Sequence, residues 1–190
     1  MNTQLPIVLA SGSPRRKEIL ETMGLSYTVD VSDVDESFSG APEETVMELS
    51  RRKAYAVSAR HPDSIIVAAD TIVYDNEILG KPGTQEAAAA MLRSLSGKWH
   101  SVYTGITIIN TKTGKMLSRA EETRVHFDAL TEQEILRYVR TNDSLDKAGA
   151  YGIQGMAGMY IDRIEGSYSN VVGLPMSLLR NMLKDVLNPD

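Results

Sequence analysis

The chain has 190 residues, 42% of them hydrophobic, with no linker or repeat, so we expect a single domain over residues 1–190 with room for two lobes. The absence of cysteine excludes disulfides, thiolate nucleophiles and cysteine-based zinc sites, and a net charge of −5 argues against a stable complex with nucleic acid. No apolar run is long enough to span a membrane and residues 1–10 lack the pattern of a leader, so we expect a cytoplasmic protein without a membrane partner.

The first unusual stretch is Ser11–Lys17, which lies between the apolar run 7–10 and a helical pattern. This order predicts a strand, a glycine-containing turn, and a helix that begins at Pro14 with Ser13 as its N-cap. The first turn of that helix holds three cations, Arg15, Arg16 and Lys17. Helix N-termini favour anions, so these side chains, the Ser11 hydroxyl and free backbone N–H groups form a candidate phosphate site. The alternative is that the cations extend into water.

A group of carboxylates follows the next predicted strand. The first helix is expected to end at Gly24, and residues 27–31 alternate like a strand. The acids that come next are Asp33, Asp35 and Glu36. Such a group either holds a divalent cation through its oxygens or forms an ordinary solvated loop, and the segment by itself favours the loop.

A long helix is predicted to begin at Pro42. Its apolar stripe, counted at about 100° per residue, consists of Val46, Leu49, Ala56 and Val57. Lys53 falls in the middle of this stripe. Because desolvating an ammonium group is costly, we interpret Lys53 as directed at an anion in a cleft, with snorkelling into water as the alternative.

The apolar run 64–69 predicts a central strand that is buried on both faces and ends at Asp70. Open α/β sheets bind ligands beyond the carboxyl ends of their strands, so Asp70 is a candidate for metal or proton chemistry. Its alternative role is to support the following turn. A small hairpin is expected over residues 72–79, and Lys81 then stands in a proline-containing loop, either as a second functional cation or as a plain surface lysine.

The middle of the chain predicts a helix and a long hairpin. Thr84 is placed to cap the helix and Gly97 to close it. Residues 99–110 and 115–127 then form two long antiparallel strands. These strands contain two isolated histidines, His100 and His126. No metal-ligand spacing connects them, so we interpret both as structural.

The second unusual stretch, residues 146–155, follows a helix that a capping box predicts from Thr131 to about Thr141. The residues expected to be buried on that helix are Ile135, Leu136 and Val139. The stretch has no amphipathic period, and it and the residues just after it contain four glycines, which permit close approach of the backbone to a ligand. Tyr151 and Gln154 are candidates to stack on and hydrogen-bond a base. A flexible loop is the alternative.

The C-terminal part predicts a strand over 159–164, a turn and short strand over 166–172, and a final helix from Pro175. The chain thus alternates strands and helices but includes a long hairpin. This combination indicates an α/β fold with a mixed sheet.

Six motifs, in order, resemble the Maf family. They are LASGSPRR at 9–16, AADTIV at 68–73, GKP at 80–82, LSG at 95–97, DKAGAYGIQG at 146–155 and GSY…VVGLP at 166–175. The match runs in register over nearly the whole chain. No single motif is decisive, but six in order make a chance similarity implausible.

The resemblance implies an inosine-triphosphatase-like fold, in which helices flank an elongated central mixed sheet and two lobes enclose a cleft. It also implies metal-dependent hydrolysis of nucleoside triphosphates to a nucleoside monophosphate and pyrophosphate, with Mg²⁺ or Mn²⁺ as cofactor. Within the family the chain is most similar to the branch that acts on dTTP and UTP. The expected biological role is nucleotide-pool sanitation, and a homodimer is an assembly to be tested.

The family's proton acceptor matches Asp70 in this chain. The positions that the family links to base choice match Arg15, Thr71 and Gln154. The expected triphosphate ligands are Ser11, Arg15, Arg16, Lys53 and Lys81. Glu36 and Asp70 are expected to hold the metal, although Asp35 is close enough to shift that assignment by one residue. Whether Asp70 acts as a base or as a metal ligand stays open at this point.

Two other functions are compatible with the sequence. A nucleotidyl- or phosphotransferase would use the same triphosphate site, and analysis for pyrophosphate or orthophosphate as product distinguishes it. The family is also associated with arrest of septum formation, so the second alternative is a regulator that binds a nucleotide or a protein without essential turnover. The dense set of acids and bases favours turnover.

Overall fold

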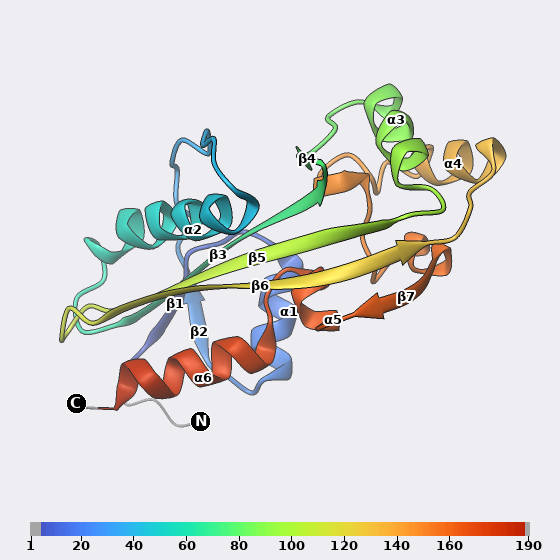
Figure 1. Cartoon of the computed structure of the whole chain (residues 1–190). Coiled ribbons are helices and arrows are strands. Elements are labelled where there is room, and N and C mark those ends of the chain that lie inside the picture. Colours follow the sequence, from blue (N-terminus) through green and yellow to red (C-terminus); the bar gives the residue numbers. More distant parts are fainter. Residues whose placement is uncertain (1–4, 189–190) are drawn as a thin grey trace. The chain divides into compact units, whose positions relative to one another are not determined.

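The computed structural model describes residues 5–188 and has a mixed α/β fold (Figure 1). Seven strands form one sheet with the hydrogen-bonding order β2-β1-β3-β5-β6-β7, and β4 pairs with β3. The chain divides into two compact units: the first contains the residues up to 70, 104–121 and those from 173 onward, and the second contains 71–103 and 122–172. The prediction of a mixed sheet flanked by helices is confirmed.

The strands are β1 (Ile7–Leu9), β2 (Tyr27–Val29), β3 (Ile65–Asp75), β4 (Glu77–Leu79), β5 (Trp99–Asn110), β6 (Met116–Phe127) and β7 (Ile161–Glu165). The helices are α1 (Pro14–Thr22), α2 (Pro42–Ser58), α3 (Gln85–Leu95), α4 (Glu132–Val139), α5 (Tyr168–Val172) and α6 (Met176–Leu187), with 3-10 turns η1 (Ala148–Ala150) and η2 (Met156–Tyr160). Strand β1 is parallel to β2 and β3, whereas β4 is antiparallel to β3 and β7 to β6. Within residues 5–188, none of these helices combines the length and apolar character needed to cross a bilayer.

In the first unit, α2 covers one face of the strands, and α1 and α6 cover the other (Figure 1). The core on the α2 face consists of Val8, Ala10, Ala54, Val57, Ile66, Ala68 and Ile109. Side chains alternate between the faces of a strand, so Asp70, which follows Ile66 and Ala68 at the same spacing of two, also points to the α2 face. This alternation brings Asp70 to the helix that carries Lys53.

Gly105 allows α2 to lie directly against β5. A Cβ atom at this position would come within 2.3 Å of the Val46 carbonyl oxygen and 2.8 Å of the Met47 amide nitrogen. Close approach of a second backbone is a common reason for glycine inside a strand. Further along, the Ser50 and Thr107 hydroxyl oxygens are 2.8 Å apart and join the same two elements. These contacts fix α2 on the sheet.

In the second unit, α3 and α4 pack on an apolar core. Its buried members include Val73, Leu92, Leu95, Val125, Phe127, Ile135, Tyr138, Tyr151 and Tyr160. The Thr84 hydroxyl accepts a hydrogen bond from the Ala87 amide, so the predicted cap of α3 is confirmed. The capping box of α4 is complete between Thr131 and Glu134, as predicted. The capping residues in the sequence therefore predicted the first residues of α3 and α4 correctly.

Two predictions about this unit were wrong. Leu136 is 39% exposed, because α4 buries Ile135, Tyr138 and Val139 and so turns Leu136 outward. Residues 166–172 form no strand: the described residues 168–172 are the short helix α5. Helix α5 buries Asn170, and the side-chain amide of Asn170 donates to the Val102 carbonyl at 3.0 Å.

The segment before β7 also differs from the prediction. Residues 156–160 form the 3-10 turn η2, so the strand begins at Ile161 and not at residue 159. The predicted strand over 27–31 is likewise shorter and ends at Val29. Both differences are boundary shifts of two residues, the usual size of such errors.

Candidate active site

Lys53 is at the centre of a charged cluster in the first unit. Its Nζ lies 2.5 Å from Asp70 Oδ1 and 2.8 Å from Glu36 Oε1. The side chains of Lys53 and Asp70 are 11% and 12% exposed, whereas that of Glu36 is 56% exposed. Lys53 therefore does not extend its ammonium into water: it is paired with two carboxylates of the protein itself.

Asp70 lies inside β3, so the prediction that the strand ends there was wrong. The strand continues to Asp75, because Ile72 and Val73 are also buried and Val73 pairs with Leu79 of β4. Asp70 thus lies in the middle of β3, on the face that α2 covers, and not at the end of the strand.

The predicted helix start at Pro14 is confirmed, and Arg16 in its first turn is held by two hydrogen bonds. Arg16 Nε donates to the Gly173 carbonyl at 2.9 Å, and Nη1 donates to Ser11 Oγ at 3.1 Å. Ser13 occupies the N-cap position, but among the described residues its hydroxyl makes no capping bond. Instead, the Ser13 amide donates to Ser11 Oγ at 3.2 Å. The hydroxyl of Ser11 thus links the turn to the Arg16 guanidinium.

The charges around Arg16 act on one another. Burial lowers the pKa of the Arg16 guanidinium. The Asp70 carboxylate acts against this shift, the neighbouring charge of Arg15 adds to it, and Glu36 opposes it. Cations and carboxylates are therefore concentrated at one place in the first unit: the cations suit phosphate groups, and the carboxylates suit a divalent cation.

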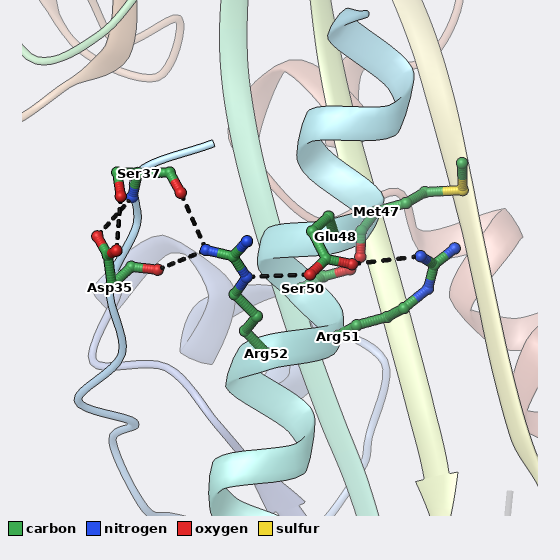
Figure 2. Close-up of polar contacts among 7 residues, drawn as sticks. All are labelled: Asp35, Ser37, Met47, Glu48, Ser50, Arg51 and Arg52. Carbon is green, nitrogen blue, oxygen red and sulfur yellow. Dashed lines mark hydrogen bonds and ion pairs between the residues drawn. The ribbon is translucent and has the colours of Figure 1, made fainter. Parts of the chain in front are cut away.

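The loop that carries Glu36 is held on α2 by Arg52 (Figure 2). Arg52 Nη1 donates to the Asp35 carbonyl at 3.2 Å and to the Ser37 carbonyl at 2.9 Å. Its Nε donates to Glu48 Oε1 at 3.0 Å. Sequence reasoning missed Arg52, because an arginine on a helix is usually solvated and its partners here are backbone carbonyls of a distant loop.

Glu36 is better placed than Asp35 to act with Asp70. The Asp35 carboxylate accepts hydrogen bonds from the Ser37 amide at 2.8 Å and the Ser37 hydroxyl at 2.6 Å, and these bonds lower its pKa. It is thus directed into its own turn, while Glu36 contacts Lys53. Within residues 5–188, no three His, Cys, Asp or Glu side chains are grouped so as to hold a metal ion. Two carboxylates fit a Mg²⁺ ion that keeps several waters and shares phosphate oxygens, but they do not form a closed protein cage.

Three predicted site residues belong to the second unit. Thr71 is partly buried on β3, Lys81 is exposed in the loop after β4, and Gln154 is exposed between η1 and η2. Glu36, Lys53 and Asp70 are in direct contact within the first unit. Thr71, Lys81 and Gln154 belong to the second unit.

The glycine-rich segment 146–155 is a packed loop. Gly149 has a φ of 66°, and a Cβ atom there would lie 2.8 Å from a methyl group of Val73. The Gly149 amide donates to the Gly80 carbonyl at 3.2 Å and thereby ties the segment to the loop that carries Lys81. Only glycine satisfies both the left-handed backbone and the close approach at this position.

Tyr151 is a core residue, so the prediction that it stacks on a base was wrong. Its side chain is buried against Phe127, with ring centroids 4.8 Å apart, and its hydroxyl lies 2.7 Å from His100 Nε2. Burial raises the pKa of Tyr151 and lowers the pKa of His100 to about 4. These contacts agree with the structural role expected for His100.

Asp143 supports the turn that carries Gln154, and sequence reasoning missed it. Its carboxylate accepts from the Tyr138 hydroxyl at 3.1 Å and from Lys147 Nζ at 2.9 Å. A Cβ atom on Gly155 would lie 3.0 Å from Asp143 Oδ2, so the turn packs tightly on this carboxylate. The sequence offers no local signal for such a contact, because an acid in a polar segment is ordinarily solvated.

The fold and the charged cluster define an α/β protein with a buried lysine–carboxylate centre beside an arginine-rich helix N-terminus. The family model described as Maf-like protein matches residues 6–186, and the chain belongs to this family. The resemblance inferred from the six motifs is confirmed.

Several relatives are similar in sequence to this chain over most of their length. The dTTP/UTP pyrophosphatase of Geobacillus sp. (strain WCH70) is 49% identical over 174 residues, which cover 90% of this chain and 92% of that protein. The dTTP/UTP pyrophosphatase of Pelotomaculum thermopropionicum is 47% identical over 181 residues, covering 94% and 95%. Among solved structures, the Staphylococcus aureus Ham1 protein has a TM-score of 0.51 at 17% identity and covers 95% of this chain and 98% of its own, which shows a similar fold.

Proposed function

We propose that this protein hydrolyses nucleoside triphosphates, dTTP and UTP in particular, to the nucleoside monophosphate and pyrophosphate, and that it acts in nucleotide-pool sanitation. Two relatives that are 49% and 47% identical carry the name dTTP/UTP pyrophosphatase. The observation that carries the proposal is the contact of the buried Lys53 ammonium with buried Asp70 and exposed Glu36, close to the charge of Arg16. Cleavage of a phosphoanhydride is catalysed mainly by positioning and by charge stabilisation, which this cluster offers.

The cations of the cluster would bind the triphosphate. An ammonium group has three N–H donors, and Lys53 directs its Nζ at two carboxylates, so a third donor can serve a phosphate oxygen. Arg16 is pre-oriented by Ser11 and by the Gly173 carbonyl. The proposed phosphate ligands are Ser11, Arg15, Arg16, Lys53 and Lys81.

Asp70 is the proposed proton acceptor. One of its oxygens is bound to Lys53, which fixes the carboxylate on the sheet. The other oxygen, Oδ2, would accept the hydrogen bond of the attacking water and then its proton. Because Asp70 is buried and held by α2, it would present this oxygen without a conformational search.

A divalent cation, Mg²⁺ or Mn²⁺, is the proposed cofactor, and Glu36 would hold it. Asp70 would be the second metal ligand only in place of its role as proton acceptor, because Lys53 occupies Oδ1 and Oδ2 serves one role or the other. When bound, it would supply positive charge to the phosphate oxygens. Removal of divalent metal with a chelator should abolish hydrolysis, and addition of Mg²⁺ should restore it.

Base choice is proposed to depend on Gln154, together with Thr71 and Arg15. A glutamine amide offers one acceptor and two donors, which match the N3–H and carbonyl oxygens shared by thymine and uracil. Cytosine presents the opposite pattern at N3 and C4. A site that pairs these groups rejects the wrong base strongly, because its polar atoms would stay unpaired.

The test is a panel of dTTP, UTP, CTP, ATP and GTP, assayed with and without Mg²⁺ and analysed for pyrophosphate and orthophosphate. We expect pyrophosphate from dTTP and UTP at a kcat/KM far above that for the other three. Gln154→Ala should narrow this gap, whereas equal losses on all five would show that Gln154 only supports its loop. Orthophosphate as the product, or no turnover, would contradict the proposed function. Sedimentation of the same sample tests whether the protein forms a homodimer.

A further inference from the structure

We propose that Arg52 is a positioning residue for the reaction, because it holds the backbone on both sides of Glu36 so that the Glu36 carboxylate reaches Lys53. The inference rests on the proposed function and adds a residue that neither the motifs nor the charged cluster identified. It follows from the contacts of the loop between β2 and α2.

Glu36 lies on an exposed loop without regular secondary structure. The described residues 30–41 form no helix or strand, and the Glu36 side chain is 56% exposed. Neither secondary structure nor burial therefore determines where its carboxylate lies. Contacts of the loop backbone are therefore expected to contribute to its position, since an exposed ion pair such as the one with Lys53 is weak.

Arg52 supplies these contacts. One of its terminal nitrogens, Nη1, donates to the carbonyl before Glu36, at Asp35, and to the carbonyl after it, at Ser37 (Figure 2). Ser37 also closes the turn by donating its amide and hydroxyl to the Asp35 carboxylate. The peptide units on both sides of Glu36 are thereby bound at once, which limits the directions open to its side chain.

The guanidinium of Arg52 is itself anchored. Its Nε donates to Glu48 Oε1, one turn earlier on α2, and it lies over the Phe38 ring with 5.6 Å from Cζ to the ring centroid. Arg52 and Lys53 are consecutive on α2, so they leave the helix about 100° apart. One short stretch of helix thus holds the loop backbone with Arg52 and the Glu36 carboxylate with Lys53.

The neighbouring Arg51 provides a matched control. It also bonds to Glu48, through Nη1 and Oε2 at 3.4 Å, and its side chain is 37% exposed compared with 33% for Arg52. The two arginines differ in that Arg52 reaches the loop (Figure 2). Arg51→Met and Arg52→Met therefore remove the same charge from the same helix, but only the second releases Glu36.

The experiment measures kcat/KM for dTTP and amide hydrogen exchange in both variants. Arg52→Met should lose about 10- to 100-fold in kcat/KM, the range that small misplacements cause, and exchange should accelerate at residues 36–38. Arg51→Met should stay within about threefold of the wild type, because it loses only an exposed ion pair. Equal losses in both variants, or unchanged exchange in Arg52→Met, would overturn the proposal. If exchange accelerates in Arg52→Met but not in Arg51→Met, the result supports the role of Arg52 in holding the Glu36 loop, whether or not the wild type releases pyrophosphate. A wild type that releases no pyrophosphate would contradict the proposed function and not the role of Arg52.

A double-mutant cycle separates positioning from general stability. If Arg52 acts through Glu36, Arg52→Met should cost little activity in a Glu36→Ala background, whereas a merely structural residue would cause the same loss in both backgrounds. Arg52→Lys keeps the charge but lacks the planar fork, so it should not restore activity. Full activity in Arg52→Lys, or equal losses in the two backgrounds, would refute the role assigned to Arg52.

Discussion

Replacing Lys53 by methionine removes the ammonium group that two carboxylates share and leaves an apolar chain of similar length. Methionine suits the site on α2, because the neighbouring Ala54 and Val57 are fully buried. The substitution should therefore keep the helix packed while it leaves Asp70 without its cation. Both activity and stability are expected to fall.

The size of the stability loss follows from the burial of each partner. Removing one member of a buried pair costs about 3–5 kcal/mol, and Asp70, with a side chain only 12% exposed, is close to that case. Glu36 is 56% exposed, so its share is below about 1 kcal/mol. New apolar contacts of methionine offset part of the loss. We therefore expect Lys53→Met to lower the free energy of unfolding by about 3 kcal/mol, which corresponds to a fall in Tm of about 6–12 °C for a chain of this size.

Thermal unfolding near neutral pH measures this effect, with the double variant Lys53→Met/Asp70→Asn as the control. Replacing both partners leaves no unpaired buried charge, so the double variant should regain most of the lost stability. An unchanged Tm in Lys53→Met would show that Asp70 does not depend on the ammonium group of Lys53. So would a double variant whose loss equals the sum of the two single losses, because it would show that the two groups do not interact.

Two further predictions concern the scaffold. Gly105→Ala should lower the free energy of unfolding by about 1–3 kcal/mol, since its Cβ would collide with the backbone of α2 at Val46. The control is Gly80→Ala, which should leave Tm nearly unchanged, because no described atom outside Gly80 and its two chain neighbours lies within 4 Å of the added Cβ. An equal fall in Tm in both variants would count against the close approach at Gly105. Because burial lowers the pKa of His100 from 6.5 to about 4, the unfolded chain binds a proton between these values that the folded chain does not. Stability should thus fall as pH drops from about 6.5 to about 4, by up to about 3 kcal/mol, and His100→Gln should flatten this slope in urea titrations; an unaltered slope would assign the effect to other groups.

Local signals in the sequence were sufficient for much of the fold. The Thr84 cap and the capping box at Thr131 lie within a few residues of the groups they bind, so the sequence alone identified both helix starts. Strand β3 was predicted too short because Asp70 interrupts an apolar run. Its continuation depends on pairing with β4, a contact that a local pattern does not contain.

The residues of the candidate site were likewise predicted only in part from the sequence. Lys53 was found because a lysine within an apolar stripe contradicts the pattern around it, and its two partners, Glu36 and Asp70, were already candidates as carboxylates next to strands. Arg52 was missed because it binds backbone carbonyls, which carry no side-chain signature. Tyr151 was misassigned since a tyrosine among glycines gives no sign that it enters the core.

The role of Asp70 is decided by pyrophosphate release from dTTP, measured for the wild type and for Asp70→Asn. The substitution is nearly isosteric, but it removes both the charge that accepts the proton or holds the cofactor and the buried partner of Lys53. Tm should therefore fall, while circular dichroism should still show a folded protein. We expect the wild type to release pyrophosphate and dTMP in equal amounts and Asp70→Asn to release neither. Pyrophosphate release at the wild-type rate by folded Asp70→Asn would contradict the mechanism built on the Lys53–Asp70 pair.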